Sequence, residues 1–353
     1  MSGRISQSFT CLKHTEERSG DAWMNYDMTG EKMEKIKSVA LLGAGAVGSY
    51  VIYGFSGCPD IRFSLVAEGA RAERLKNDGC LINGDVYHPE VLSPAEAHDV
   101  DLLIVALKYG ALKEALPAIQ ATVGENTTVM SLMNGVDSED IIASVIGAEH
   151  MIYSMIKVAS SRQEGRGCCF DPETTVGIIY GEANAPYDSA RIRAMEDTFG
   201  RSRLHTRHTD CIREEIWNKF RLNVCNNLPQ AILGVGVGCY RDSAHMKAIS
   251  DGLRHEVEQI AEAKGVDMEK LAMLDSKGCL VSPAARYSTL QDLDAGRHTE
   301  IDMFSGTLMR MGEDFGIPTP FNTCVYHLIK AREEKNDGLF DYDGKTDKSC
   351  WAK

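Results

Sequence analysis

The sequence predicts a doubly wound α/β domain followed by an all-α domain. From residue 37 to about residue 205, short apolar runs of strand length alternate with helix-compatible segments, which is typical of βαβ units. Beyond that point the apolar residues recur at helical spacing instead. We therefore expect domains at residues 37–205 and 206–335, a weakly ordered extension at 1–36 and a polar tail at 336–353.

The first expected strand, residues 38–42, leads into a glycine-rich turn, Gly43-Ala44-Gly45-Ala46-Val47-Gly48, and then into a helix-compatible segment. Strand, G-x-G-x-x-G turn and helix together form the dinucleotide-binding fingerprint of the Rossmann fold. Gly43 permits the tight turn, Gly45 lets the backbone approach a pyrophosphate, and Gly48 allows close packing of helix on strand. The N-terminus of a helix suits phosphate. We expect cofactor contacts from Gly43, Gly45, Ala46, Val47 and Gly48; the alternative is a turn that only packs.

The other strands follow in chain order. Four are expected at residues 62–67, 101–107, 127–133 and 151–158. Asn83-Gly84 between two short runs predicts a hairpin over residues 80–91. A strand pair over residues 167–181 is expected to close the sheet, because residues 174–180 are β-branched and apolar.

Four helices are expected in the second domain, at residues 212–233, 244–264, 268–274 and 299–315. Gly265 and Gly316 stand where two of them would end. Pro229 lacks an N–H and its ring crowds the carbonyl of Cys225, so the first helix should kink nearby. From Glu333 onward the chain is polar and is expected to fray.

Composition excludes several classes of function. The formal net charge is −13 and there is no basic stripe, which argues against nucleic acid or an anionic membrane surface as partner. No apolar stretch is long enough for a membrane span, and no secretory signal is visible. Eleven cysteines without a C-x-x-C pair indicate reduced thiols in a cytoplasmic protein, with neither a disulfide framework nor a metal site.

Residues at strand ends are the first candidates for a ligand site, because open α/β sheets bind ligands at the carboxyl ends of their strands. Lys108 follows residues 101–107, where it can contact cofactor phosphate or ribose; a solvated loop lysine is the alternative. Asn134, before Gly135, follows residues 127–133 and is either a functional amide or a simple turn residue.

Glu68, just after the second strand, is the candidate selector for the cofactor ribose. A carboxylate at this place accepts hydrogen bonds from the ribose hydroxyls and repels a 2′-phosphate. Arg71 and Arg74 follow closely and counter that repulsion. The local charge favours NAD without excluding NADP.

The helix at residues 212–233 carries Lys219, Asn223 and Asn227 at i, i+4 and i+8, and therefore on one face. Such a set is costly to bury without partners, so the face is either functional or solvated. Further on, Glu300 and Asp302 are expected in the first turn of the helix at residues 299–315. Carboxylates suit that position, so capping explains both acids.

Taken together, these residues resemble the ketopantoate reductase (2-dehydropantoate 2-reductase) family. The matching pieces occur in the family's order over about residues 37–330, and each alone is only modest evidence. They are Gly43 to Gly48, Ala106-Leu107-Lys108, Asn134-Gly135-Val136, Trp217-Asn218-Lys219-Phe220 with Asn223 and Asn227, Ser288-Thr289-Leu290-Gln291-Asp292, Gly296-Arg297-His298-Thr299-Glu300-Ile301-Asp302 and Gly316-Ile317-Pro318-Thr319-Pro320.

The resemblance implies NADPH-dependent reduction of a 2-oxo acid, ketopantoate, to pantoate, a step of pantothenate biosynthesis. It implies that Lys219 is the general acid, which agrees with the chemistry because negative charge develops on the carbonyl oxygen as hydride arrives. By the same resemblance, Glu300 would hold Lys219 and the substrate hydroxyl, Asn223, Asn227 and Ser288 would bind substrate, Asn134 would lie between nicotinamide and substrate, and Lys108 would contact the cofactor.

Two departures from the family pattern bear on specificity. The family commonly has a basic residue near the position of Glu68, so NADH stands beside NADPH as a candidate cofactor. Thr289 replaces the commoner methionine after the serine. Two other interpretations stay open: a paralogous 2-oxo-acid or hydroxyacid dehydrogenase with another substrate, and a non-catalytic NAD(P)-binding sensor. The expected partner is a small-molecule 2-oxo acid, and a homodimer is left open.

Overall fold

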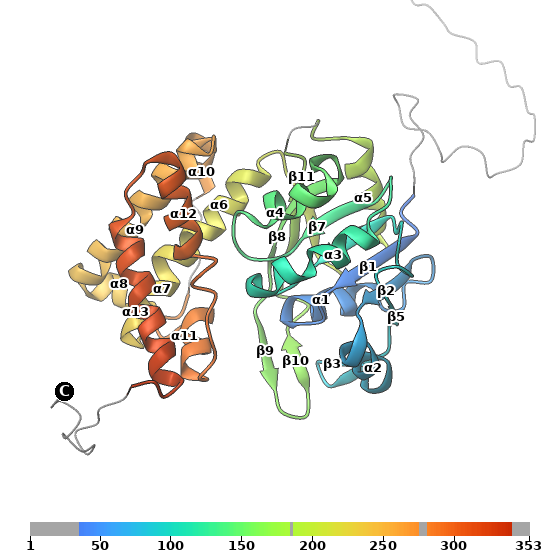
Figure 1. The fold of residues 1–353 in the computed structure, drawn as a ribbon, viewed down its shortest axis with the longest axis horizontal. Helices are drawn as coiled ribbons and strands as arrows, with labels where there is room; N and C mark the ends of the chain where they lie inside the picture. The colour runs from blue at the N-terminus through green and yellow to red at the C-terminus, as the bar shows by residue number, and fades with distance from the viewer. Residues whose placement is uncertain (1–34, 184–185, 275–280, 341–353) are drawn as a thin grey trace, which may run out of the picture.

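The computed structural model describes residues 35–183, 186–274 and 281–340 and has two halves (Figure 1). The first half is built on a β-sheet, and every described element from α6 (Ile212–Leu222) onward is helical. In Figure 1, α6 extends from the helical half to the sheet. This arrangement confirms the predicted fold class, a Rossmann-type doubly wound domain with an all-α domain. Most of the predicted N-terminal extension lies outside the described residues, and the predicted domain bounds stay a prediction.

An eight-stranded sheet in the order β12-β11-β8-β7-β6-β1-β2-β5 organises the first half. All neighbouring strands are parallel except β8 and β11. Strand order reverses between β1 and β6, which is the switch point of a doubly wound sheet. The strands are β1 (Ser38–Leu42), β2 (Arg62–Val66), β5 (Glu90–Leu92), β6 (Leu102–Val105), β7 (Thr128–Ser131), β8 (Met151–Lys157), β11 (Gly177–Gly181) and β12 (Thr206–His208).

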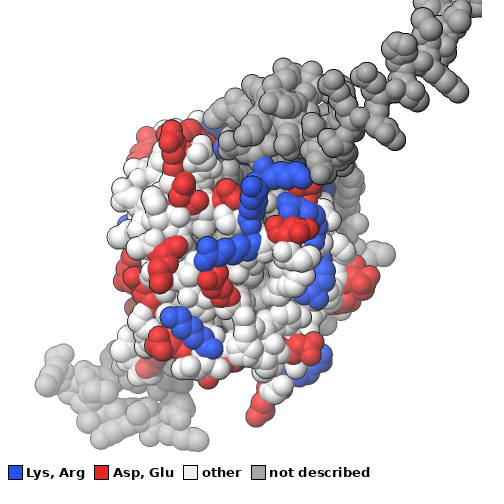
Figure 2. Space-filling view, turned by 90° about the vertical axis from the view of Figure 1, so that its right-hand side faces the viewer, with Lys and Arg blue, Asp and Glu red and all other residues white. Residues whose placement is uncertain are grey.

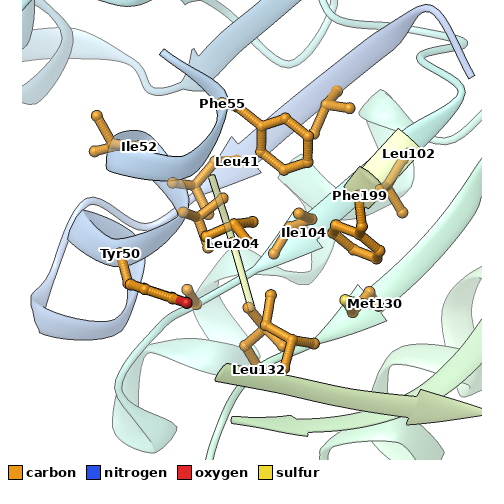
Figure 3. Close-up of a cluster of buried hydrophobic side chains, with 14 of the residues drawn as sticks. Leu41, Tyr50, Ile52, Phe55, Leu102, Ile104, Met130, Leu132, Phe199 and Leu204 are labelled. Atoms are coloured by element: carbon orange, nitrogen blue, oxygen red, sulfur yellow. The ribbon is translucent and has the colours of Figure 1, made fainter. Parts of the chain in front are cut away.

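Side chains alternate along the central strands, so each face of the sheet has its own core. On one face Leu102 and Ile104 pack with residues of α1 and α5, as Figure 3 shows for Phe55 and Phe199. On the other face Leu103 packs with residues of α3 and α4. The helices and helical turns of this half are α1 (Ala46–Phe55), α2 (Gly69–Asp78), η1 (Tyr109–Ala111), α3 (Leu112–Thr122), α4 (Ser138–Ile146), η2 (Ala148–His150) and α5 (Ala190–Gly200).

Two predictions about the strands need correction. The hairpin consists of β3 (Cys80–Ile82) and β4 (Asp85–Tyr87), with Asn83 and Gly84 at φ of 53° and 98°, as a tight hairpin turn requires. It stops before β5, which pairs with β2 instead. Likewise β10 (Gly167–Phe170) does not close the main sheet. It joins β3 and β9 (Ser160–Gln163) in a separate four-stranded sheet, which pairs edges that would otherwise be open.

The helical half packs around one core that includes Trp217, Phe220, Leu253 and Phe304. Three predicted helices are found at nearly the expected positions, and Gly316 ends α12 with φ of 68°. The elements after α6 are a π-helical segment (Asn223–Asn227), α7 (Leu228–Leu233), α8 (Cys239–Asp242), α9 (Ala244–Ala263), α10 (Met268–Leu274), α11 (Ser288–Asp294), α12 (Ser305–Phe315) and α13 (Pro320–Asn336).

The end of the chain differs from the prediction. Residues 333–336 do not fray, because α13 continues to Asn336, and residues 341–353 of the predicted polar tail lie outside the described residues. Glu333 is only 2% exposed and accepts hydrogen bonds from the backbone N–H and the hydroxyl of Thr299. Glu333 is therefore held by Thr299, 34 residues earlier in the chain. Helical periodicity gives no sign of a contact between such distant residues.

The described residues also show how charge is distributed on one face, whether a helix can cross a membrane, and where Cys168 and Cys169 lie. Figure 2 shows lysine and arginine side chains interspersed with acidic ones on one face of the molecule. Within residues 35–183, 186–274 and 281–340, none of the helices is both long and apolar enough to cross a membrane. Cys168 and Cys169 are both buried, as expected for thiols inside the fold.

Gly48 marks the closest approach of α1 to the glycine-rich turn. A Cβ there would lie 1.9 Å from the carbonyl oxygen of Gly43, so Gly48→Ala must push the helix away from the turn. We expect a loss of about 1–3 kcal/mol of stability, the usual cost of overpacking, measured by urea unfolding. Gly200→Ala is the control, since nothing lies within 4 Å of its added Cβ. Equal midpoints for Gly48→Ala and wild type would contradict the prediction.

Candidate active site

The glycine-rich turn has the shape that a dinucleotide needs. Gly43 has φ of +114°, and a Cβ there would lie 2.4 Å from the carbonyl oxygen of Ala106, so only glycine fits. Nothing lies within 4 Å of a Cβ built on Gly45, which precedes α1 without a side-chain cap. The N–H groups of the first turn, which includes Ala46 and Val47, are therefore open to a phosphate. These residues fit a bound dinucleotide.

Glu68 and Lys108 lie at the same edge of the sheet as this turn. Glu68 is exposed and precedes α2, just beyond β2. Lys108 follows β6 and is 70% exposed; its ammonium lies 3.6 Å from Glu300 and 3.8 Å from Asp292. Because β1, β2 and β6 are parallel neighbours, their carboxyl ends bring the glycine turn, Glu68 and Lys108 together.

Lys219 of α6 enters this edge from the helical half. Its ammonium donates hydrogen bonds to Asn134 Oδ1 at 2.8 Å and to the carbonyl oxygen of Ile156 at 2.6 Å. Asn134 follows β7, and Ile156 lies near the carboxyl end of β8. Burial and, to a smaller extent, the charge of Lys157 lower the pKa of Lys219 to about 8, against the opposing effect of Glu300.

Asn134 also connects Lys219 to Glu300. Its amide nitrogen donates to Glu300 Oε2 at 3.4 Å, while its oxygen accepts from Lys219. The backbone N–H of Tyr109 donates to the other Glu300 oxygen at 3.4 Å. The capping explanation of Glu300 is therefore wrong: α12 begins only at Ser305, and the carboxylate of Glu300 faces the strand ends.

Asp302, the second acid expected to cap that helix, also has another position. It is exposed and accepts a hydrogen bond from the hydroxyl of Tyr326 at 2.7 Å. Lys330 lies 3.5 Å away. Asp302 therefore joins the turn before α12 to α13 and has no contact with Lys219 among the described residues.

Asn223 and Asn227 continue the face of Lys219 through a π-helical segment. The amide of Asn227 donates to Asn223 Oδ1 at 3.3 Å. The irregularity expected near Pro229 has a specific form, because the hydroxyl of Tyr240 inserts into the helix. It donates to the carbonyl of Asn226 at 2.6 Å and accepts from the N–H of Gln230 at 3.2 Å. Such π-segments occur frequently at functional sites.

Ser288 lies further from the centre. It is exposed at the start of α11, and in the part of the chain that the structure describes no hydrogen bond joins it to Lys219, Asn134 or Glu300. Helix α11 itself packs against α7 and the π-segment. The helix that begins at Ser288 therefore lies against the segment that carries Asn223 and Asn227, and one turn on its Asp292 lies 3.8 Å from Lys108.

Two cavities lie beside α6, on either side of Ile216. The smaller is lined by Asn134, Ser154, Lys219 and Asn223. The larger, of about 240 Å³, is lined by Tyr153, Arg213, Trp217 and the buried Glu139, whose pKa burial raises to about 7. Of these two cavities, only the smaller has the Lys219 side chain in its lining.

Sequence reasoning missed Lys157 and the backbone carbonyl of Ile156. Both lie at the carboxyl end of β8, beside the strand ends that supplied Lys108 and Asn134. The rule that identified those two residues applies equally to Lys157, so the signal was present. A backbone carbonyl, by contrast, has no signature in the sequence.

Comparison with known proteins identifies this chain's relatives. The family description "Ketopantoate reductase PanE/ApbA" matches residues 39–176, and "Ketopantoate reductase PanE/ApbA C terminal" matches residues 211–333. A curated relative, 2-dehydropantoate 2-reductase of Streptococcus pyogenes serotype M18 (strain MGAS8232), is 27% identical over 311 residues, covering 84% of this chain and 97% of the relative.

Two solved structures share the fold. One is a PanE/ApbA family ketopantoate reductase from Ralstonia eutropha JMP134, with a TM-score of 0.70 at 22% identity, covering 85% of this chain and 99% of that one. The other is D-mandelate dehydrogenase with NADH and anilino(oxo)acetate, with a TM-score of 0.70 at 21% identity and the same two coverages. At these identities the likeness concerns the fold.

Fold, glycine turn and matched sequence together define the class: an NAD(P)-dependent oxidoreductase. The chain belongs to the ketopantoate reductase family. The resemblance identified from the motifs is thereby confirmed.

The Tyr240 hydroxyl bridge makes a prediction about the π-segment. Tyr240→Phe leaves the Asn226 carbonyl and the Gln230 N–H without their partner, which should cost about 1–3 kcal/mol in thermal or urea unfolding. Tyr326→Phe removes a hydroxyl that bonds the exposed Asp302 and serves as the control. If both variants unfold with the same midpoint, the Tyr240 bridge does not contribute to stability.

Proposed function

We propose that this protein uses NAD(P)H to reduce a 2-oxo acid, 2-dehydropantoate to pantoate, with Lys219 as the general acid. The observation that carries the proposal is the position of the Lys219 ammonium. It comes from the helical half and reaches Asn134 and the Ile156 carbonyl, at the same carboxyl edge of the sheet from which the glycine turn begins. A bound nicotinamide would supply hydride at this edge of the sheet.

Lys219 is oriented for proton donation. An ammonium has three N–H donors, and the described residues occupy two of them, through Asn134 and the Ile156 carbonyl. The third can point to a carbonyl oxygen in the adjoining cavity. As that oxygen gains negative charge, the ammonium stabilises it and then transfers a proton to it. Partial burial strengthens both effects, because water screens the charge less.

The neighbours of Lys219 position it and the substrate. Asn134 holds the ammonium with its oxygen and Glu300 with its nitrogen, so the three side chains form one connected set. Glu300 then accepts the hydroxyl of the product. Asn223 and Asn227 offer amide groups along the same helix face, and together with Ser288 they would bind the substrate.

Two observations bear on alternatives. The fold similarity to D-mandelate dehydrogenase supports the same reaction type on another 2-oxo acid as the second candidate. A non-catalytic sensor has no use for a partly buried lysine with a lowered pKa. For the cofactor, exposed Glu68 favours NADH and exposed Arg71 and Arg74 favour NADPH. The homodimer stays a prediction.

The first test is turnover. Purified protein is mixed with ketopantoate and a series of branched or aromatic 2-oxo acids, with NADH and NADPH in parallel, and oxidation of the cofactor is followed by absorbance. We expect Lys219→Ala to lose about 10²- to 10⁴-fold in kcat, because the proton donor is gone, while cofactor binding persists. Absence of turnover with every acid would refute the reaction, and near-normal activity of Lys219→Ala would refute the assignment of the acid.

The second test is pH dependence. The acid must be protonated to act, and the pKa of Lys219 is lowered to about 8 by burial and by Lys157. Reduction should therefore hold below that pH and decline above it, with kcat/KM falling about tenfold per pH unit. The measurement is a pH profile of kcat/KM. A plateau that extends to pH 10 would show that another group supplies the proton.

A further inference from the structure

Lys157 is the last residue of β8 and lies beside the proposed proton donor. The carbonyl of the preceding residue, Ile156, accepts a hydrogen bond from Lys219 Nζ at 2.6 Å. The peptide group that joins Ile156 to Lys157 thus accepts the hydrogen bond from the Lys219 ammonium. Lys157 is only partly exposed.

Strand geometry places the Lys157 side chain on the α6 side of the sheet. Tyr153 and Met155 pack in a cluster with Ile212 and Ile216 of α6. Side chains two residues apart in a strand point the same way, so Lys157 continues the row of Tyr153 and Met155. Lys219 lies three residues after Ile216 and therefore continues the same face of α6.

The charges around these two lysines are not balanced. The Lys157 charge lowers the pKa of Lys219, whereas Glu300, before α12, and Glu139, on α4, raise it. Lys108, the other lysine at this edge, is compensated by Glu300 and Asp292. Within residues 35–183, 186–274 and 281–340, no ion pair joins Lys157 to an acid. Two like charges so close to the end of β8 are costly unless an anion binds near both of them.

We propose that Lys157 binds the carboxylate of the 2-oxo acid whose carbonyl oxygen faces Lys219. The inference rests on the proposed function and specifies its substrate class. In a 2-oxo acid the carboxylate carbon is bonded directly to the carbonyl carbon. Two neighbouring ammonium groups therefore suit it, with Lys157 at the carboxylate and Lys219 at the carbonyl oxygen. Lys157 therefore selects free acids over neutral carbonyl compounds such as lactones, esters and amides.

The test compares a charged and a neutral form of one substrate. We measure kcat/KM for ketopantoate and for ketopantoyl lactone, which carries the ketone without the carboxylate, in wild type and Lys157→Met. A lost charge-assisted contact should reduce kcat/KM for the acid by about 10- to 100-fold. Activity on the lactone should not fall in parallel. Lys157→Arg should recover part of the preference for the acid.

Controls separate a fold defect from the proposed contact. Lys247→Met removes an exposed lysine on α9 that pairs with Asp251, and should leave both substrates unaffected. Cofactor affinity, read from the fluorescence of the reduced nicotinamide, should be equal in wild type and Lys157→Met. A loss equal for acid and lactone, or no loss, overturns the proposal.

The outcome is distinguishable from failure of the reaction itself. If wild type reduces no 2-oxo acid, the proposed function fails, and calorimetric binding of ketopantoate to the cofactor-loaded protein becomes the readout. Binding that disappears in Lys157→Met supports the carboxylate contact without turnover. Binding that is equal in both proteins, or absent in wild type, overturns it.

Discussion

The contact of one ammonium with the strand ends is the interaction on which the site depends. Lys219 belongs to α6, yet its two hydrogen-bond acceptors among the described residues are Asn134, which follows β7, and the Ile156 carbonyl of β8. A buried ammonium without partners would be expensive, so these acceptors determine where α6 sits as well as what Lys219 can do. A second set of contacts supports the same junction, because Asp137 of the α4 N-terminus accepts hydrogen bonds from both Tyr109 and Thr307 of α12.

The strand ends at the site carry positive charge, although the whole chain is negatively charged. The chain carries a formal net charge of −13, but Lys108, Lys157 and Lys219 all meet at the carboxyl edge of the sheet. Acidic neighbours compensate Lys108, whereas Lys219 lines a cavity and the nearby charge of Lys157 lowers its pKa. An acidic enzyme can therefore attract an anionic substrate and an anionic cofactor, because local fields outweigh net charge at contact distance.

Helix irregularity has a definite cause here. Pro229 removes one backbone donor, but the Tyr240 hydroxyl then bridges the gap between Asn226 and Gln230. The π-segment widens the helix over Asn223–Asn227 and places Asn223 in the lining of the Lys219 cavity, with Asn227 bonded behind it. The local distortion and the position of the two amides are thus parts of one arrangement.

The sequence by itself determined the glycine turn, the positions of the main strands along the chain, the helix end at Gly316 and the shared face of Lys219 and Asn223. Each of these follows from local periodicity or from a backbone angle that few residues adopt. Only the tertiary structure decided that Glu300 faces Asn134, 166 positions away, instead of capping a helix, and that Lys157 stands beside Lys219. Such contacts depend on how α6 packs against β8, and packing between distant segments leaves no periodic trace in the chain.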